Sequence, residues 1–582
     1  MKYPVLTELA ATREMINIFG GYNHNLRIGD GEFYDMKNLS SDDYPILSPR
    51  AKRGIYATPT NPQGMISKDS LCYVDGMYFV INEHRIDMRL STAEKDCPKN
   101  LVSMGSYVII MPDKKWINTT DFSYGNIEAT VTTTTKTTFT HCKLDGTDYS
   151  NENVTISDET PLNPNDLDYW IDISRTPHTL KQYSATSAMW VAIATTYIKI
   201  SATGIGAPFD IGDGVKITGV EIDELSDLNS SMIIQGRGDD YIIVIGIIDE
   251  VKTQDSAITV KRQMPNMDFI IESENRLWGC RYGLSVNNEF VNEIYASKLG
   301  DFKNWNSFEG VSTDSYVVSL GTDGQFTGAI TYLGFPLFFK ETCMHKVYGN
   351  YPANYRIQTT TCRGVQKGSE NSLGIVNEIL YYKSRTSVCY YDGSLPVEIS
   401  SAFGDISYYK AVAGTLGNKY FISMADADDV YHLFVYDTKK GLWHKEDNTQ
   451  VVEFCNCRGE LYYIDHTTKQ IKTVKGTGAI DDATIEWEAT TGIIGTDSPD
   501  KKYISRLDVR LSLKLGTRVY FFVQYDSSEE WEELCVMDGI TLKTFAVPIR
   551  PHRCDHLRLK IIGEGEAKIY SICKTIEQGS DL

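Results

Sequence analysis

HLFVYDTKKGLWHKEDN, residues 432–448, contains a strand, a tight turn and a second strand within one short stretch. Between residues 432 and 437, His, Phe and Tyr alternate with Leu, Val and Asp, which is the period of two expected for a strand with a buried face. In the turn that follows, Asp437 can accept backbone N–H groups and Gly441 can adopt a positive φ. Leu442 then starts the return strand. The stretch therefore predicts a β-hairpin.

The same pattern of aromatic strand, turn and strand recurs along the chain, although the copies share no invariant residues. Hairpin pairs follow one another at intervals of roughly 40–50 residues, which is the spacing of four-stranded propeller blades. We therefore predict a β-propeller, and an unrelated run of meanders is the alternative. The further copies are LCYVDGMYFVIN (71–82), ILYYKSRTSVCYYDGS (379–394) and GELYYIDHTTKQIKTVKG (459–476), with looser ones at 276–297 and 332–350.

Composition agrees with an all-β chain. Its 582 residues are enough for about three or four domains. The hydrophobic content of 42% can fill large cores, and 11% aromatic residues with 36 tyrosines is a richness that suits sheets. No long helical periodicity is present. The best short helical candidate is ELAATREMINIF (8–19), whose apolar residues could share one side: Leu9, Met15, Ile16 and Phe19.

Changes in residue composition and in the hydrophobic pattern divide the chain into four segments. Residues 1–118 hold an N-terminal piece and the first hairpins. Residues 119–264 begin with a Thr-rich stretch and continue with short β-branched strands, which predicts a small β-barrel or sandwich inserted in the propeller. Hairpins resume over 265–476, and long alternating strands over 477–582 predict a C-terminal β-sandwich or, alternatively, final blades. The two propeller segments hold about 330 residues, which corresponds to about six to eight blades.

Charge and cysteine content exclude several classes of protein. The formal net charge of −20 argues against wrapping nucleic acid, because that requires a basic surface that neutralises phosphates. The N-terminal stretch lacks the apolar core of a secretory signal, and no run of about 18 apolar residues predicts a membrane span. The 12 cysteines are too sparse for a disulfide scaffold. Together these features predict synthesis in a reducing cytoplasm.

Sequence motifs of metal or catalytic chemistry are mostly missing. The chain contains no HExxH, GxSxG or P-loop pattern. Cys455 and Cys457 share one face of a predicted strand and could ligate a metal, but the distant His466 alone does not complete a site. We therefore interpret the two cysteines as small core residues.

Acidic residues are the remaining candidates. Asp426, Asp428 and Asp429 could bind Ca²⁺, but the Gly and the closing Glu of a calcium loop are missing, which favours a polar hairpin turn. A glycosidase needs converging carboxylates, whereas the acids available here sit in turns, where they commonly serve structure. We predict no catalytic residue, no cofactor-binding residue and no metal ligand. The carboxylates considered are Asp75, Asp392, Glu398 and Asp465.

Three phrases of the sequence resemble virion proteins of tailed bacteriophages. They are FGGYNHNLRIGDGEFYDMKNLSSDDYPILSPR (19–50), ENRLWGC with NEIYASKLGDFKNWNSF (274–308), and GAITYLGFPLFFKETCMHKVYGN (328–350). More distantly, their order is similar to the propeller-bearing tail nozzle proteins of short-tailed phages. The resemblance implies a hexameric ring below the portal and adaptor, in contact with tail fibre proteins, without catalysis or cofactor. The insertion at 119–264 has no counterpart in it.

The function expected from this resemblance is structural. The protein would be a non-catalytic ring in a phage tail, a nozzle or distal tube that continues the DNA exit channel without sequence-specific binding. Its place would be the virion tail, after synthesis in the host bacterial cytoplasm. The alternative is a tail-tip protein that binds a receptor or a glycan. A surface polysaccharide depolymerase is a third hypothesis, which requires carboxylates roughly 5–9.5 Å apart in a cleft.

Overall fold

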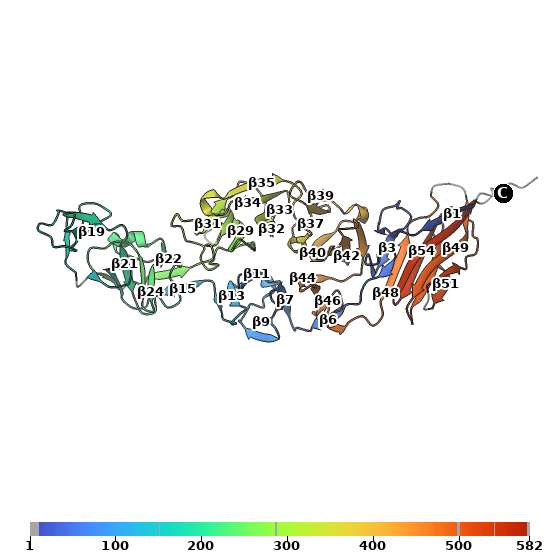
Figure 1. Ribbon diagram of the computed structural model, residues 1–582, viewed down its shortest axis with the longest axis horizontal. Coiled ribbons are helices and arrows are strands. Elements are labelled where there is room, and N and C mark those ends of the chain that lie inside the picture. The colour runs from blue at the N-terminus through green and yellow to red at the C-terminus, as the bar shows by residue number, and fades with distance from the viewer. Residues whose placement is uncertain (1–10, 150–151, 286–287, 497–500, 540–541, 579–582) are drawn as a thin grey trace, which may run out of the picture.

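The computed structural model describes residues 11–149, 152–285, 288–496, 501–539 and 542–578. Its regular structure is almost entirely β-strand, and the helices within these ranges are short 3-10 turns. The molecule is elongated, with a ring of sheets in the middle, an inserted unit at one end and a C-terminal unit at the other (Figure 1). The predicted all-β class is confirmed. No helix in the described ranges is long and apolar enough to cross a membrane.

The aromatic stretch at 432–448 forms the predicted hairpin. Strand β42 (Tyr431–Asp437) pairs antiparallel with β43 (Leu442–Lys445). In the turn between them, Asp437 Oδ1 accepts two backbone N–H groups, and Gly441 adopts a φ of 70°. The turn chemistry therefore works as the sequence indicates, with a carboxylate as acceptor and a glycine in the left-handed region.

The central ring contains six four-stranded sheets in the described ranges, each built from consecutive antiparallel strands. Figure 1 shows them around a common centre. Their strands are β7 (Pro62–Ser67), β8 (Leu71–Asp75), β9 (Tyr78–Ile81) and β10 (His84–Asp87); β11 (Asn100–Met104), β12 (Tyr107–Met111), β13 (Lys115–Asn118) and β14 (Tyr124–Asn126); β28 (Phe269–Ser273), β29 (Arg276–Leu284), β30 (Phe290–Ala296) and β31 (Tyr316–Ser319); β32 (Phe326–Tyr332), β33 (Phe335–Lys340), β34 (Cys343–Tyr348) and β35 (Arg356–Thr361); β36 (Gly374–Val376), β37 (Ile379–Lys383), β38 (Val388–Tyr391) and β39 (Val397–Glu398); and β40 (Tyr409–Leu416), β41 (Lys419–Ala425), β42 and β43.

A further sheet closes the ring by combining strands from both ends of the propeller. Strand β46 pairs with β6 from the N-terminal side, and β6 pairs in turn with β47. Arg53, next to β6, strengthens the closure: its guanidinium lies 2.6 Å from Glu446 Oε2 and 2.7 Å from Asp447 Oδ2. The strands of this sheet are β44 (Val451–Cys457), β45 (Glu460–Asp465), β46 (Ile471–Thr473), β6 (Gly54–Ala57) and β47 (Ala479–Ile480).

The first strands of successive sheets contact one another around the whole ring. Strand β7 contacts β11, β11 contacts β28, and β28 contacts β32. The 3-10 helix η5 (Glu370–Ser372) joins β32 to the next sheet, after which β36 contacts β40, β40 contacts β44, and β44 contacts β7. Because this chain of contacts returns to its start, the predicted β-propeller is confirmed, and the first strand of each sheet is the innermost one.

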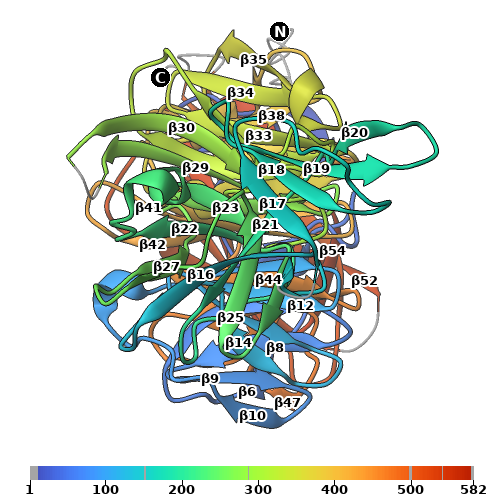
Figure 2. The same ribbon diagram turned by 90° about the vertical axis from the view of Figure 1, so that its left-hand side faces the viewer.

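The insertion has a core of its own. Two of its sheets share one buried cluster, which includes Phe139, Ile200 and Val260. It lies in front of the propeller when the molecule is viewed from that end (Figure 2). Strand β14 still belongs to the ring, so the insertion starts after residue 126 rather than at 119. Its strands are β15 (Ala129–Thr132), β27 (Thr259–Arg262), β22 (Gly214–Thr218) and β23 (Ser231–Ile233); β24 (Gly236–Gly238), β25 (Tyr241–Ile245), β21 (Tyr197–Ser201), β16 (Thr137–Cys142) and β26 (Lys252–Gln254); and, in a third sheet, β17 (Val154–Ser157), β18 (Tyr169–Asp172), β19 (Thr179–Ser184) and β20 (Met189–Ala192).

The C-terminal unit is the predicted β-sandwich, but it also takes strands from the N-terminal segment. Its two sheets bury a common core that includes Leu507 and Phe521. The N-terminal strands β1 and β3 pair with the C-terminal strands β54 and β48. The sheets contain β1 (Ala11–Ile16), β54 (Ala567–Gln578), β49 (Lys502–Leu513) and β52 (Lys543–Val547), and β2 (Gly21–Tyr22), β3 (Glu32–Lys37), β48 (Glu486–Thr491), β53 (Leu557–Glu564), β50 (Arg518–Tyr525) and β51 (Glu532–Asp538).

The helical candidate at 8–19 is wrong where it is described. Residues 8–10 lie outside the described ranges, and Ala11–Ile16 form strand β1, with Met15 opposite Cys573 of β54. The edge of β54 offers backbone donors and acceptors along this whole segment, and pairing with them outweighs a weak helical preference.

Candidate functional site

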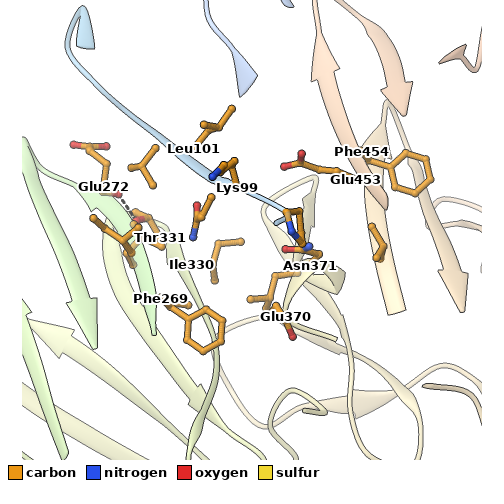
Figure 3. A pocket seen from close by; sticks show the side chains of 18 of the residues that line it. Lys99, Leu101, Phe269, Glu272, Ile330, Thr331, Glu370, Asn371, Glu453 and Phe454 are labelled. Carbon is orange, nitrogen blue, oxygen red and sulfur yellow. Dashed lines mark hydrogen bonds between the residues drawn. The ribbon is translucent and has the colours of Figure 1, made fainter. Parts of the chain in front are cut away.

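The inner strands of the propeller enclose a cavity of about 720 Å³. Its wall comes from β11, β28, β32, β40 and β44 and from η5, so residues far apart in the sequence meet there. Lys99, Glu272, Glu370, Asn371 and Glu453 surround this space (Figure 3). A concave space with a few convergent polar groups is where ligand sites are usually found, and this cavity is therefore the candidate functional site.

Irregular pairing in the inner strands helps to aim side chains at the cavity. The register shifts within β7, β32, β40 and β44, all of which are first strands of their sheets. A bulge of this kind bends the strand and turns the next side chain to a new direction. Val412 and Glu453 are the first paired residues after the shifts in β40 and β44, and both line the cavity.

Glu453 is a carboxyl of this wall whose pKa is raised above its usual value. Its Oε2 accepts the N–H of Met65 in β7 at 2.7 Å, which links the closing sheet to the first sheet of the ring. The surrounding protein keeps bulk water away from the charged form and raises the pKa of Glu453 to about 8, although the N–H group opposes that rise. At neutral pH the carboxyl is mostly protonated, and its side chain still borders the cavity.

Glu370 and Asn371 are held at the cavity by the serines on either side of them. Ser369 Oγ accepts the N–H of Ala411 at 3.0 Å, and the carbonyl oxygen of Ser372 accepts the hydroxyl of Tyr420 at 2.6 Å. The short turn η5 is thereby tied to the sheet of β40–β43, because Ala411 lies in β40 and Tyr420 lies in β41. Among the described residues, the Glu370 side chain finds neither an ion pair nor a hydrogen-bond partner.

Lys99 is the only basic residue among the described residues that line the cavity. Its Nζ lies 2.7 Å from Asp113 Oδ2, and the two side chains are 0% and 4% exposed. The pair brings no net charge to the wall, because the cation is neutralised beside the site. A buried cation requires such a partner.

Two further acids line the cavity from β28 and the segment before it. Asp268 Oδ1 lies 2.6 Å from Arg281 Nη1 and is neutralised by it. Glu272 Oε1 accepts the N–H of Asn275 at 2.9 Å. Thr331 Oγ1 donates to the backbone carbonyl of Glu272, the contact drawn as a dashed line in Figure 3, so β28 and β32 are joined at the wall.

The cysteines considered for a metal site lie elsewhere. Cys455 and Cys457 are buried with Met65 and Leu71 in a hydrophobic cluster between the closing sheet and the first sheet. His466 is exposed in the turn after β45. Across the ranges that the structure describes, no group of at least three His, Cys, Asp or Glu side chains could hold a metal ion.

The acidic turn at 426–429 is held together by its own hydrogen bonds. Asp426 Oδ1 accepts the N–H groups of Asp428 and Val430, each at 3.0 Å, and its Oδ2 lies 2.8 Å from His432 Nε2. Asp429 forms an ion pair with Lys410 at 2.7 Å. These contacts are those of a polar hairpin turn.

The four carboxylates considered for catalysis do not come together at the cavity, and none of them lines it. The prediction that they sit in turns holds only for Asp392, because Asp75, Glu398 and Asp465 are the last residues of β8, β39 and β45. Each is engaged locally in a turn or an ion pair. Asp75 accepts the N–H of Asn61, Asp392 that of Ser394 and Asp465 that of Thr467, while Glu398 lies 3.0 Å from Arg363.

Sequence reasoning missed the acids that do line the cavity. Glu272 and Glu453 lie within the first strands of their sheets, and Glu370 lies just before one. The available signal was an acid inside an otherwise apolar or aromatic strand at the start of a repeat, such as the Glu of VVEFCNC (451–457). Such an acid needs either a hydrogen-bond donor of the protein or a strand that borders water or a ligand.

No protein family and no curated protein matches this sequence. Among solved structures, an exo-β-1,3-galactanase of Phanerochaete chrysosporium is 9% identical with a TM-score of 0.21, over 52% of this chain and 94% of that one. PorZ, a surface component of the type IX secretion system of Porphyromonas gingivalis, is 9% identical with a TM-score of 0.17, over 84% and 71%. A Trypanosoma rangeli sialidase is 10% identical with a TM-score of 0.15, over 98% and 96%. At these values the likeness transfers no activity to this chain.

These findings contradict the expected function of a ring in a phage tail. No family model and no curated protein matches the three segments that suggested a tail protein, and none of the solved structures named above is described as a phage tail protein. Those segments consist largely of turn glycines and strand aromatic residues, which the packing of a propeller requires in any case. They are therefore poor markers of function. The prediction of a ring that continues a DNA exit channel is therefore wrong. The resemblance, the hexameric ring and the virion location stay untested predictions.

Proposed function

We propose that this protein binds a carbohydrate in the central cavity of its propeller. The volume of about 720 Å³ lies within the range of small-molecule sites. Carboxyl and amide groups on its wall can exchange hydrogen bonds with sugar hydroxyls, and the apolar surface of Ile330 and Phe269 can pack against the C–H face of a sugar ring. This combined polar and apolar lining is the observation that carries the proposal.

The Glu453 side chain and the backbone that carries Glu370 and Asn371 are held in place before any ligand arrives. Glu453 is fixed by the N–H of Met65, and the turn with Glu370 and Asn371 is fixed by its neighbouring serines. A site whose side chains are already ordered loses less conformational entropy on binding. These parts of the wall therefore need little rearrangement when a ligand binds.

The proposal is tested by screening the full chain on a glycan array and measuring the hits by calorimetry. Glu370→Ala should weaken binding roughly tenfold or more, because a hydrogen bond to a charged group contributes about 1.5–3 kcal/mol. The matched control is Glu378→Ala, an exposed glutamate in the turn between β36 and β37 that is not part of the cavity wall. A folded protein that binds no glycan, or an equal loss in both variants, would contradict the proposal.

Glycoside hydrolysis is a second candidate function, favoured by the state of Glu453. A general acid must be protonated at the working pH, and burial raises the pKa of Glu453 to about 8. Glu272 and Glu370 on the same wall could supply the carboxylate that such a mechanism pairs with the acid. The leaving-group oxygen would take the proton of Glu453 while the second carboxylate activates water or attacks the sugar.

Hydrolysis is tested by incubating the protein with the oligosaccharides that it binds and measuring new reducing ends. Glu453→Gln should abolish release while leaving binding within a few fold, because the amide can replace the neutral carboxyl as a partner of Met65 but cannot donate an acidic proton. Release that survives in this variant would exclude Glu453 as the acid. No release by the unaltered protein would leave binding alone as the function.

A further inference from the structure

We propose that the cavity selects carbohydrates that carry a protonated amine, such as glucosamine or galactosamine units without their N-acetyl groups. The proposal rests on the carbohydrate-binding function above and adds the charge of the ligand to it. The observation behind it is that some charged side chains at the cavity have an oppositely charged partner in the protein, whereas others have none.

Carboxyls outnumber cations on the cavity wall. Asp268, Glu272, Glu370 and Glu453 line it, against Lys99 as the single basic residue among the described lining residues. The Lys99 cation is already neutralised by an ion pair outside the wall, with its Nζ 2.7 Å from an Asp113 oxygen. Of the acids, Asp268 is neutralised by an arginine at 2.6 Å.

Two carboxylates remain without a cation. Within the described part of the chain, neither Glu272 nor Glu370 forms an ion pair, and Glu370 has no hydrogen-bond donor either. Glu272 receives one backbone N–H, which fixes one of its oxygens at the wall. Because the walls of a cavity restrict water and concentrate field lines, these two charges act on a ligand more strongly than they would on an open surface.

A ligand with an ammonium group supplies the cation that Glu272 and Glu370 lack. A hydrogen bond from an ammonium group to a carboxylate is roughly twice as strong as one between neutral groups. A uronic or sialic acid would place a like charge beside Glu272 and Glu370, in a protein whose formal net charge is already −20. The neutral Asn371 amide and the apolar Ile330 remain to contact hydroxyls and the sugar ring.

The test compares oligomers of equal length whose sugar units carry a positive, a neutral or a negative group. Binding of a β-1,4-linked glucosamine tetramer, its N-acetylated form and a galacturonate tetramer to the full chain is measured by calorimetry at about pH 6 and low salt. We expect the free amine to bind roughly tenfold or more tightly than the acetylated tetramer, and the galacturonate tetramer most weakly. This preference should shrink as salt is added.

Two variants connect the preference to the cavity. Glu370→Gln and Glu272→Gln keep the shape of the wall but remove its charge, so each should reduce the difference between the free amine and its acetylated form. Glu378→Gln, away from the wall, should leave the difference unchanged, and circular dichroism confirms that each variant is folded. Equal or tighter binding of the acetylated tetramer overturns this inference but leaves carbohydrate binding in place. Failure of the array and of all three tetramers to bind overturns both.

Discussion

A single residue type acquires different chemistry according to its distance from the propeller axis. Glu398, on the outermost strand β39, is exposed and forms an ion pair with Arg363 at 3.0 Å. Glu453, on the innermost strand β44, faces protein and cavity, and burial raises its pKa to about 8. The difference arises because the outer carboxylate is solvated and paired, whereas the inner one has only a backbone N–H as donor.

The raised pKa of Glu453 predicts a pH dependence of stability. The usual pKa of this group is 4.5, so between that value and about 8 the folded protein binds more protons than the unfolded chain. The contribution of the protonated Glu453 carboxyl to the stability of the folded state is therefore complete below pH 4.5, and it is lost as the pH rises through about 8. Glu453→Gln mimics the neutral form, and we expect it to be more stable than the unaltered protein at about pH 9 by about 1–3 kcal/mol.

Denaturant titrations of both proteins at about pH 5, 7 and 9 measure this difference. The advantage of the variant should shrink steadily toward pH 5, where the unaltered carboxyl is already protonated in the folded state. A constant difference across the pH range would show that the substitution acts through packing and not through the charge of Glu453.

Among the strands, β6 does most to close the ring. It lies between β46 and β47, far from them in sequence, and converts an open series of sheets into a closed one. Closure removes the exposed edges that an open series would present to other chains. Gly54, which begins β6, is buried, and its Cα faces neighbouring backbone: a Cβ there would lie 2.5 Å from the carbonyl oxygen of Thr477.

Gly54→Ala should therefore destabilise the protein by about 1–3 kcal/mol, because the strand must shift to relieve the contact. The matched control is Gly321→Ala, where a Cβ would meet no atom within 4 Å and the backbone suits any residue. That control should be neutral or slightly stabilising. Unfolding by denaturant measures both, and limited proteolysis should cut the Gly54 variant more readily around β6. Equal stability of the two variants would contradict the role assigned to this contact.

At the scale of the whole molecule, the two end units are attached to the propeller in different ways. The sandwich shares one buried cluster with the last part of the propeller, in which Tyr420 and Trp443 belong with Leu507. The insertion has a separate core, and its first and last strands, β15 and β27, pair directly with each other. Its entry and exit points are therefore adjacent, as expected of an inserted domain.

Replacing residues 129–262 with a short Gly-containing turn should leave a folded propeller. A modest loss of stability is expected, because the contact of Gly214 N–H with Asn304 Oδ1 at 2.8 Å would disappear. Circular dichroism, gel filtration and glycan binding measure the outcome, and binding should persist because no insertion residue lines the cavity. An unfolded or aggregated product would show that the insertion is part of the propeller's cooperative unit.

The amino-acid sequence alone determined the local structure and, through its repetition, the class of fold. Alternating aromatic strands and Asp- and Gly-containing turns specify hairpins within a few residues of each other, so the hairpin at 432–448 and the all-β propeller could be predicted. Only the tertiary structure decided that residues 11–16 form a strand and that Glu272, Glu370 and Glu453 meet at one cavity. The reason is physical: the edge of β54, the bulges of the inner strands and the closure of the ring are contacts between residues far apart in the chain, and no local pattern records them.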